Sequence, residues 1–217
     1  MPIPLRRSFH QELADIERSV NVLFALVAEG LSGATDALLS GDLDAARQLA
    51  QQDSEVDRIY SGVEAVVERQ LTLQSPAASD LRFLLNVLRI LPELERSGDL
   101  TEHIAARAAR GLGSELPPRV RLLVQRMGEV GVSMWRGVAD AFAQRDAEAA
   151  SRLREEDDEL DDLHSSLTAE LASQGLATPV TMEMALVGRF YERLGDHAVN
   201  IAERVRLLAP HSSPPEA

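Results

Sequence analysis

The feature that most constrains this fold is an internal repeat of helical segments. Residues 94–107 read LERSGDLTEHIAAR and residues 191–204 read YERLGDHAVNIAER, so an ER-x-GD element recurs at an offset of 97 residues. Residues 40–60 and 143–164 align at an offset of 104 residues, and several acidic residues occupy corresponding positions in this alignment. Two repeated segments in the same order predict a chain built from two related halves.

Apolar residues recur at helical spacing from end to end, which predicts an all-α protein. Pro and Gly residues divide this pattern into six helices, with Asp42 and Asp146 as N-caps and Pro92 as a kink or local break in the third. The predicted helices run approximately over residues 4–39, 42–73, 77–110, 118–144 and 146–173, and from the turn at 175–179 to 208.

The strongest break inside the chain is the Gly- and Pro-rich segment 111–118. We therefore predict two tandem antiparallel three-helix bundles related by the repeat, over residues 1–112 and 113–209. Residues 210–217, a Pro- and Ser-rich tail, are predicted to be disordered.

Charge and composition exclude several classes of function. The formal net charge of −13 disfavours nucleic acid and anionic lipid as partners. The absence of Cys excludes disulfides, thiolate metal sites and a cysteine nucleophile. No apolar run is expected to approach the roughly 20 residues of a membrane span, and the N-terminus lacks a signal-peptide pattern, so a cytoplasmic protein without membrane insertion is expected.

Both halves repeat one chemical element, an acidic residue followed four positions later by Asp. Spacing of i to i+4 places both carboxylates on one helix face. If the two helices that carry these pairs in each half are antiparallel neighbours, four carboxylates converge in each half. The four pairs are Asp53–Asp57, Glu95–Asp99, Asp157–Asp161 and Glu192–Asp196.

The acidic pairs are predicted to lie on the surface, because on the last helix they point away from the apolar stripe. Residues 155–162 read EEDDELDD, and such dense charge destabilises a helix unless solvent, salt or a cation offsets it. Carboxylate sites suit hard ions such as Mg²⁺, Ca²⁺ and Mn²⁺, and nearby His103 and His164 add affinity for Fe or Zn. A solvated acidic surface without metal is the alternative.

With its two repeats and its ERLGDHAVNIAER element, the chain resembles the PhoU family of phosphate-uptake regulators. The resemblance covers essentially the whole chain before the tail. It implies two three-helix bundles, a cytoplasmic location, a homodimer and bound Fe, Zn, Mn or Mg ions. It also implies negative regulation of phosphate import through the ATPase subunit of the phosphate ABC transporter, and of starvation signalling through a sensor histidine kinase, with no catalytic residue.

The resemblance assigns the metal ligands residue by residue. The first cluster takes Asp53, Asp57, Glu95 and Asp99, and the second takes Asp157, Asp161, Glu192 and Asp196. Asn200 and Glu203 match later positions of the motif and, with His103 and His164, are possible additional ligands. In the first half His103 stands at the Asn200 position and Ala106 at the Glu203 position, so the two sites are not assumed to be equivalent.

Two other functions stay open at this point. A di-iron carboxylate enzyme requires Glu-x-x-His pairs that project into a four-helix core, whereas no Glu here has a His three residues later. A helical scaffold without metal is the other possibility, and metal analysis separates it from a metal-binding regulator.

Overall fold

The structure, a computed structural model, describes residues 3–50, 53–173 and 175–208 and is all-α within these ranges. The predicted fold class is confirmed. In chain order the elements are α1 (Ile3–Ser40), α2 (Leu43–Leu49), α3 (Asp53–Leu73), α4 (Ala78–Ala108), the 3-10 helix η1 (Leu112–Glu115), α5 (Pro118–Gln144), α6 (Ala149–Ser173) and α7 (Thr178–Arg206). The predicted tail, residues 210–217, lies outside the described residues.

The predicted second helix is wrong in one respect, because two helices, α2 and α3, occupy its range. Asp42 caps α2 as predicted, since its carboxylate accepts hydrogen bonds from the amides of Asp44 and Ala45. The buried stripe of α3 contains Val56, Val63 and Val67, while α2 buries Ala46. At about 100° per residue, position 46 is rotated by roughly 80° from the stripe of α3. The two helices therefore bury faces that are offset from one another.

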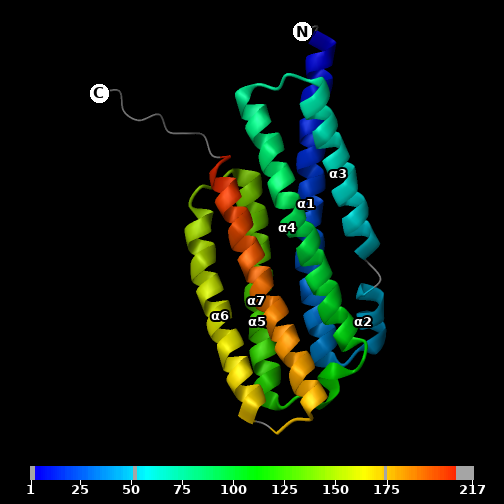
Figure 1. Cartoon of the computed structure of the whole chain (residues 1–217), viewed down its shortest axis with the longest axis vertical. Coiled ribbons are helices and arrows are strands. Elements are labelled where there is room, and N and C mark those ends of the chain that lie inside the picture. Colours follow the sequence, from blue (N-terminus) through cyan, green and yellow to red (C-terminus); the bar gives the residue numbers. More distant parts are fainter. Residues whose placement is uncertain (1–2, 51–52, 174, 209–217) are drawn as a thin grey trace, which may run out of the picture.

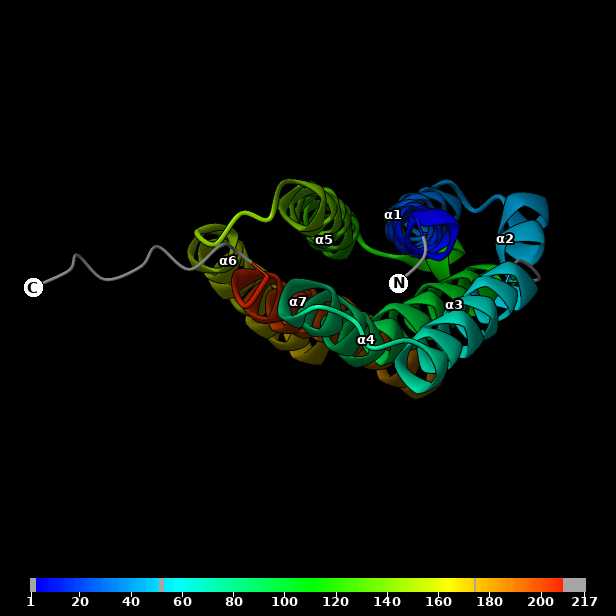
Figure 2. The same cartoon turned by 90° about the horizontal axis from the view of Figure 1, so that it is seen from above.

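The long helices run side by side along the molecule (Figure 1). Seen from above, α6, α7, α4 and α3 form a curved row, with α5 and α1 together on its inner side (Figure 2). In the first half α1 and α3 pack on α4, and in the second half α5, α6 and α7 pack on one another. The halves meet where α1 packs on α5 and α4 packs on α7.

One apolar core runs through both halves. The largest fully buried side chains include Trp135 and Tyr191 from the second half and Phe24 from the first. The local break predicted at Pro92 is absent, because α4 is a single helix from Ala78 to Ala108. Pro92 lies inside this helix, and its neighbour Leu91 is buried in the core.

Helix α1 contains, between Phe9 and Ser40, a stretch long and apolar enough to span a membrane by length and composition alone. The sequence-based expectation of no such run is therefore wrong. Half of this stretch (50%) is buried in the structure. Because α1 packs on α3, α4 and α5, its apolar character is that of a core helix.

Candidate functional site

The first acidic patch consists of Asp57 on α3 and of Glu95 and Asp99 on α4. Asp57 is exposed, and the two side chains of α4 are partly buried. Burial raises the pKa of Glu95 above its usual value, and the charges of Asp99 and Asp57 raise it further. The structure thus brings three of the four predicted carboxylates together. The side chain of the fourth, Asp53, lies outside the described part of the chain.

The second acidic patch consists of Asp157 and Asp161 on α6 and of Glu192 and Asp196 on α7. Burial raises the pKa of Asp157 to about 6, and the charges of Asp161 and Asp196 add to this effect. Three of the predicted carboxylates therefore share one electrostatic environment. It disfavours their simultaneous ionisation unless a cation is present.

Asp157 is the most constrained member of the second patch. Its Oδ1 atom is buried and has no hydrogen-bond partner in the structure. This atom lies where the Cβ of any residue larger than glycine at position 195 would stand. Gly195 thus makes room for the Asp157 carboxylate.

Glu192, also in the second patch, has one cation, Arg189, and one imidazole, His164, beside it. It forms an ion pair with Arg189, one turn earlier on α7, and lies 3.8 Å from Nδ1 of His164. Burial lowers the pKa of His164, and the charge of Arg189 lowers it further, which favours the neutral imidazole. As the side chains stand, Glu192 is engaged in a salt bridge to Arg189.

The other possible metal ligands, Glu203, Asn200 and His103, are placed less favourably for binding a metal. Glu203 pairs with Arg154 and with Arg206, so it links α7 to α6. Asn200 is exposed. His103 packs its ring against Phe190 of the other half, with centroids 5.6 Å apart.

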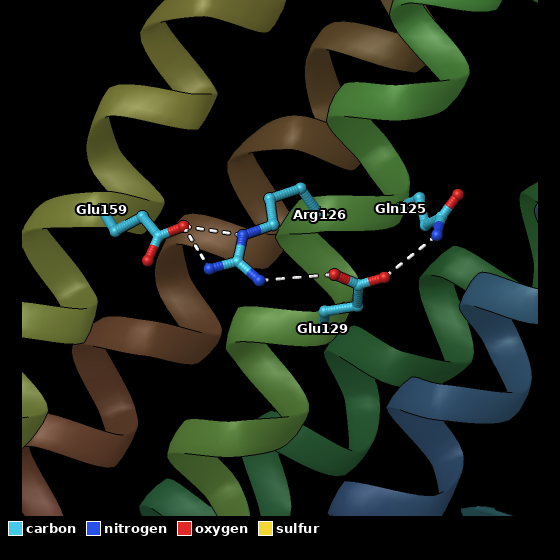
Figure 3. Close-up of polar contacts among 4 residues, drawn as sticks. All are labelled: Gln125, Arg126, Glu129 and Glu159. Atoms are coloured by element: carbon cyan, nitrogen blue, oxygen red, sulfur yellow. Dashed lines mark hydrogen bonds and ion pairs between the residues drawn. The ribbon is translucent and has the colours of Figure 1, made fainter.

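The dense run of acids on α6 is partly neutralised by α5. Nε of Arg126 donates to Glu159 at 2.7 Å, and Nη1 donates to Glu129 at 3.4 Å (Figure 3). Gln125 binds the other oxygen of Glu129 at 2.9 Å. The repulsion that the sequence indicated is thus offset in part by arginine, before any metal is considered.

The donor set of both patches suits a hard cation, because it consists of carboxylate oxygens. The unpartnered Oδ1 of Asp157 and the raised pKa values of Asp157 and Glu95 are what a cation would relieve. Within the described residues, however, no group of three or more His, Asp or Glu side chains is already gathered around one point in the manner of a metal site. Binding therefore requires rotation of side chains such as Glu192.

Sequence reasoning missed the role of His197. This residue is 6% exposed and lies between α7 and α4, where its Nδ1 shares a hydrogen bond of 2.8 Å with Oγ of Ser97. Burial lowers the pKa of His197, while Glu93, whose carboxylate is 3.6 Å from Nε2, raises it. Its position three residues after Leu194 of the apolar stripe was the signal that it faces inward.

A second polar contact also joins the halves in the core. The hydroxyl groups of Tyr191 and Thr35 share a hydrogen bond of 2.7 Å, and both side chains are buried. Helices α4 and α7 therefore carry acidic-patch residues and also contact the other half.

Comparisons with known proteins agree with this architecture. The family model of the PhoU domain matches residues 20–108 and 124–205, once in each half. A phosphate-specific transport system accessory protein PhoU homolog 1 from Mycobacterium leprae is 32% identical over 97% of this chain and 96% of its own length. A PhoU homolog from Synechocystis sp. is 33% identical over 94% of this chain and 92% of its own length.

Two solved structures share the fold. The PhoU of Pseudomonas aeruginosa superimposes with a TM-score of 0.85 at 29% identity, over 92% of this chain and 98% of that one. The phosphate transport system regulatory protein PhoU of Streptococcus pneumoniae superimposes with a TM-score of 0.83 at 28% identity, over 92% and 96%.

Proposed function

The chain belongs to the PhoU family, and from this premise we propose that it is a non-enzymatic, metal-binding negative regulator of high-affinity phosphate uptake and phosphate-starvation signalling. The observation that carries the proposal is the family match in both halves, together with relatives named as accessory proteins of the phosphate-specific transport system. The proposed partners are the ATPase subunit of the phosphate ABC transporter and a phosphate-sensing histidine kinase. The proposed setting is the cytoplasm, with the protein as a homodimer.

The two acidic patches are the proposed metal sites. Asp57, Glu95 and Asp99, with Asp53, would hold a cation in the first half. Asp157, Asp161 and Asp196, with Glu192 after release from Arg189, would hold one in the second. A bound cation would neutralise carboxylates that repel one another and so link α3 to α4 and α6 to α7. The chain's own residues position the donors, since glycine at position 195 leaves space for Asp157.

Regulation is proposed to work through protein contacts. The described acids are exposed or partly buried on helix surfaces, which does not match the interior carboxylates of a di-iron enzyme. The continuous apolar core suits a protein that presents surfaces to partners. A helical scaffold without metal remains the second candidate, and the experiments below separate the two.

The test of regulation is a reporter of phosphate-starvation genes in cells that lack this protein. We expect expression in high phosphate without the protein and repression when the wild-type chain is restored. Continued expression with a folded, normally abundant wild-type chain would overturn the proposed function.

The test of metal binding is elemental mass spectrometry of the purified protein. The comparison is a variant with Glu95→Gln, Asp99→Asn, Glu192→Gln and Asp196→Asn. We expect stoichiometric metal in the wild type and loss of it in the variant. No metal in either protein, even after incubation with iron, zinc, manganese and magnesium, would leave the scaffold candidate.

A further inference from the structure

A groove runs between α1 and α5, the corresponding first helices of the two halves. It is formed by a cavity of about 770 Å³ and a second of about 310 Å³, which share Arg136 and Asp140 in their walls. On α1 the lining extends from Asn21 to Leu39, and on α5 from Gln125 to Ala143. At 1.5 Å per residue, the groove is about 27 Å long, the length of a helix of roughly 18 residues.

The floor of the groove is made of small side chains and a close helix contact. Gly128 of α5 is buried against Thr35 of α1, and a Cβ at position 128 would overlap the Thr35 side chain. Ala28, Ser32 and Gly137 continue the lining on either side. These small side chains favour the close approach of another helix, and the larger lining residues Phe24 and Trp135 are fully buried. Gln125 and Arg136 are exposed lining residues that an occupant would contact.

The walls of the groove are acidic. Glu29 and Asp36 on α1 and Glu129 and Asp140 on α5 are all exposed and line it. Arg136 is the single basic residue among the described lining residues, so the formal charge of the lining is −3. This potential favours a cationic occupant.

Glu129 is fixed in place at this wall. One of its carboxylate oxygens accepts from Gln125 and the other from Arg126, as Figure 3 shows. These hydrogen bonds lower the pKa of Glu129, so the side chain stays ionised at neutral pH. Gln125 thus keeps the carboxylate oriented, while the pair with Arg126 offsets part of its charge.

The groove is separate from both acidic patches. It lies between α1 and α5, which stand together on the inner side of the curved row, whereas the patches lie on helices of the row itself (Figure 2). The described members of the two patches are absent from its lining. An occupant of the groove therefore leaves the proposed metal ligands in place.

We infer that the groove between α1 and α5 docks a basic amphipathic helix of a partner protein, with an Ala- or Leu-rich face on the floor and Lys or Arg side chains against the acidic walls. A second copy of this chain is a poorer occupant, because a chain of net charge −13 would bring like charges together. The inference rests on the proposed function in one respect, namely that the protein acts through protein contacts.

The experiment measures binding of a fluorescent synthetic helix of about 18 residues, with Lys on one face and Ala and Leu on the other, to the full chain by anisotropy. A scrambled peptide of the same composition is the ligand control. The groove variant carries Glu29→Gln, Asp36→Asn, Glu129→Gln and Asp140→Asn. Its matched control removes four exposed acids elsewhere, with Asp44→Asn, Glu68→Gln, Glu155→Gln and Asp162→Asn.

We expect the groove variant to weaken binding at least about tenfold and the matched control by less than about twofold, because close charge pairs give specific coupling and remote charges are screened. A second variant, Ser133→Trp, blocks the groove sterically at an exposed position without changing charge and should weaken binding as strongly. Equal loss in the groove and control variants, or unchanged binding by Ser133→Trp, would overturn the inference.

Two further readouts separate other occupants and the proposed function. Sedimentation of wild type and groove variant tests a second copy, since a dimer lost only in the groove variant would assign the groove to self-association and overturn the inference. In the starvation reporter, wild-type chain that fails to repress counts against the proposed function. If wild type and groove variant repress equally, the result counts against the groove inference and leaves the proposed function standing.

Discussion

The two acidic patches carry the same carboxylates in corresponding positions, yet the cations beside them differ. At the offset of 97, Glu192 corresponds to Glu95, and its partner Arg189 corresponds to Pro92. In the second half the carboxylate of α7 is therefore paired one turn away. In the first half proline occupies that place, and the pKa of Glu95 is raised by burial and by neighbouring acids.

The ion pairs that join α6 to α5 and to α7 in the second half also have no counterpart at the corresponding positions of the first half. Arg154, which binds Glu203, corresponds to Ala50 at the offset of 104, and Glu203 corresponds to Ala106 at the offset of 97. Arg126, which binds Glu159, corresponds to Val22 if the offset of 104 extends to the first helices. That extension is supported by the ends of α1 and α5, at Ser40 and Gln144.

The two halves thus share the four carboxylates of each patch but not the arginines that pair with acids in the second half. The electrostatic strain consequently falls on different helices, on Glu95 of α4 in the first patch and on Asp157 of α6 in the second.

Replacing each of the corresponding glycines by alanine should affect the halves differently. Gly195→Ala places a methyl group against Oδ1 of Asp157 and 2.8 Å from a methyl of Leu160, whereas Gly98→Ala meets the Val56 side chain, with its nearest methyl at 3.2 Å. Overpacking costs about 1–3 kcal/mol, and alanine regains up to about 1 kcal/mol of helix propensity.

We therefore expect Gly195→Ala to lower the free energy of unfolding in urea and Gly98→Ala to leave it unchanged or raise it slightly. Equal destabilisation by both substitutions would show that the two glycines have the same role.

Removing the strained carboxylate of the second patch should stabilise the metal-free protein at neutral pH. The pKa of Asp157 is about 6 in the folded state and about 3.9 in an unfolded chain, so its protonated form favours folding. This stability is present below about pH 4 and is lost as pH rises through about 6.

With chelator present, Asp157→Asn should raise the free energy of unfolding at pH 7.5 by about 1 kcal/mol, after allowance for solvent screening, and by nothing at pH 4. Thermal melts over this pH range, beside the exposed-site control Asp162→Asn, check the difference. A gain that does not depend on pH would contradict the electrostatic origin.

Removing the arginine that pairs with Glu192 should leave this carboxylate without its i,i+3 ion pair, as Glu95 is in the first patch. Arg189→Gln removes an ion pair between side chains that are 51% and 17% exposed, so the loss of stability should not exceed about 1 kcal/mol. If Glu192 is a ligand, its release should raise the affinity of the second patch for Mn²⁺ severalfold, as measured by titration calorimetry. Arg193→Gln, at an exposed position on the same helix, is the control. Unchanged affinity would mean that Arg189 does not compete with the metal.

Much of the fold was readable from the sequence because its signals are local. Helical periodicity and the breaks at Gly and Pro predicted α5 from Pro118 to Gln144, and Asp42 was correctly identified as a cap. The division of the second helix was missed, since no Gly or Pro marks a break between α2 and α3 in the sequence. The domain boundaries stay a prediction, because a single core joins the halves.

The acidic patches were predictable from i,i+4 spacing, whereas their neutralisation was only partly so. Arg189 stands three residues before Glu192 and could have been identified as its partner. The pair of Arg126 and Glu159 is separated by 33 residues and depends on how α5 packs on α6. The groove was not predictable, because its walls come from helices in different halves.

The smallest expected effect concerns this long-range pair, which distinguishes the second half. Arg126 and Glu159 are 50% and 43% exposed, so a double-mutant cycle with Arg126→Gln and Glu159→Gln should give a coupling of about 0.5 kcal/mol that shrinks in about 1 M salt. The comparison is Arg58 with Glu55 on α3, one turn apart at 3.6 Å, for which a smaller coupling is expected. If both cycles give the same coupling, the cross-helix geometry adds nothing to a local pair. A larger coupling for Arg126 would instead show that joining α5 to α6 stabilises the acidic helix, a link that valine at position 22 cannot supply in the first half.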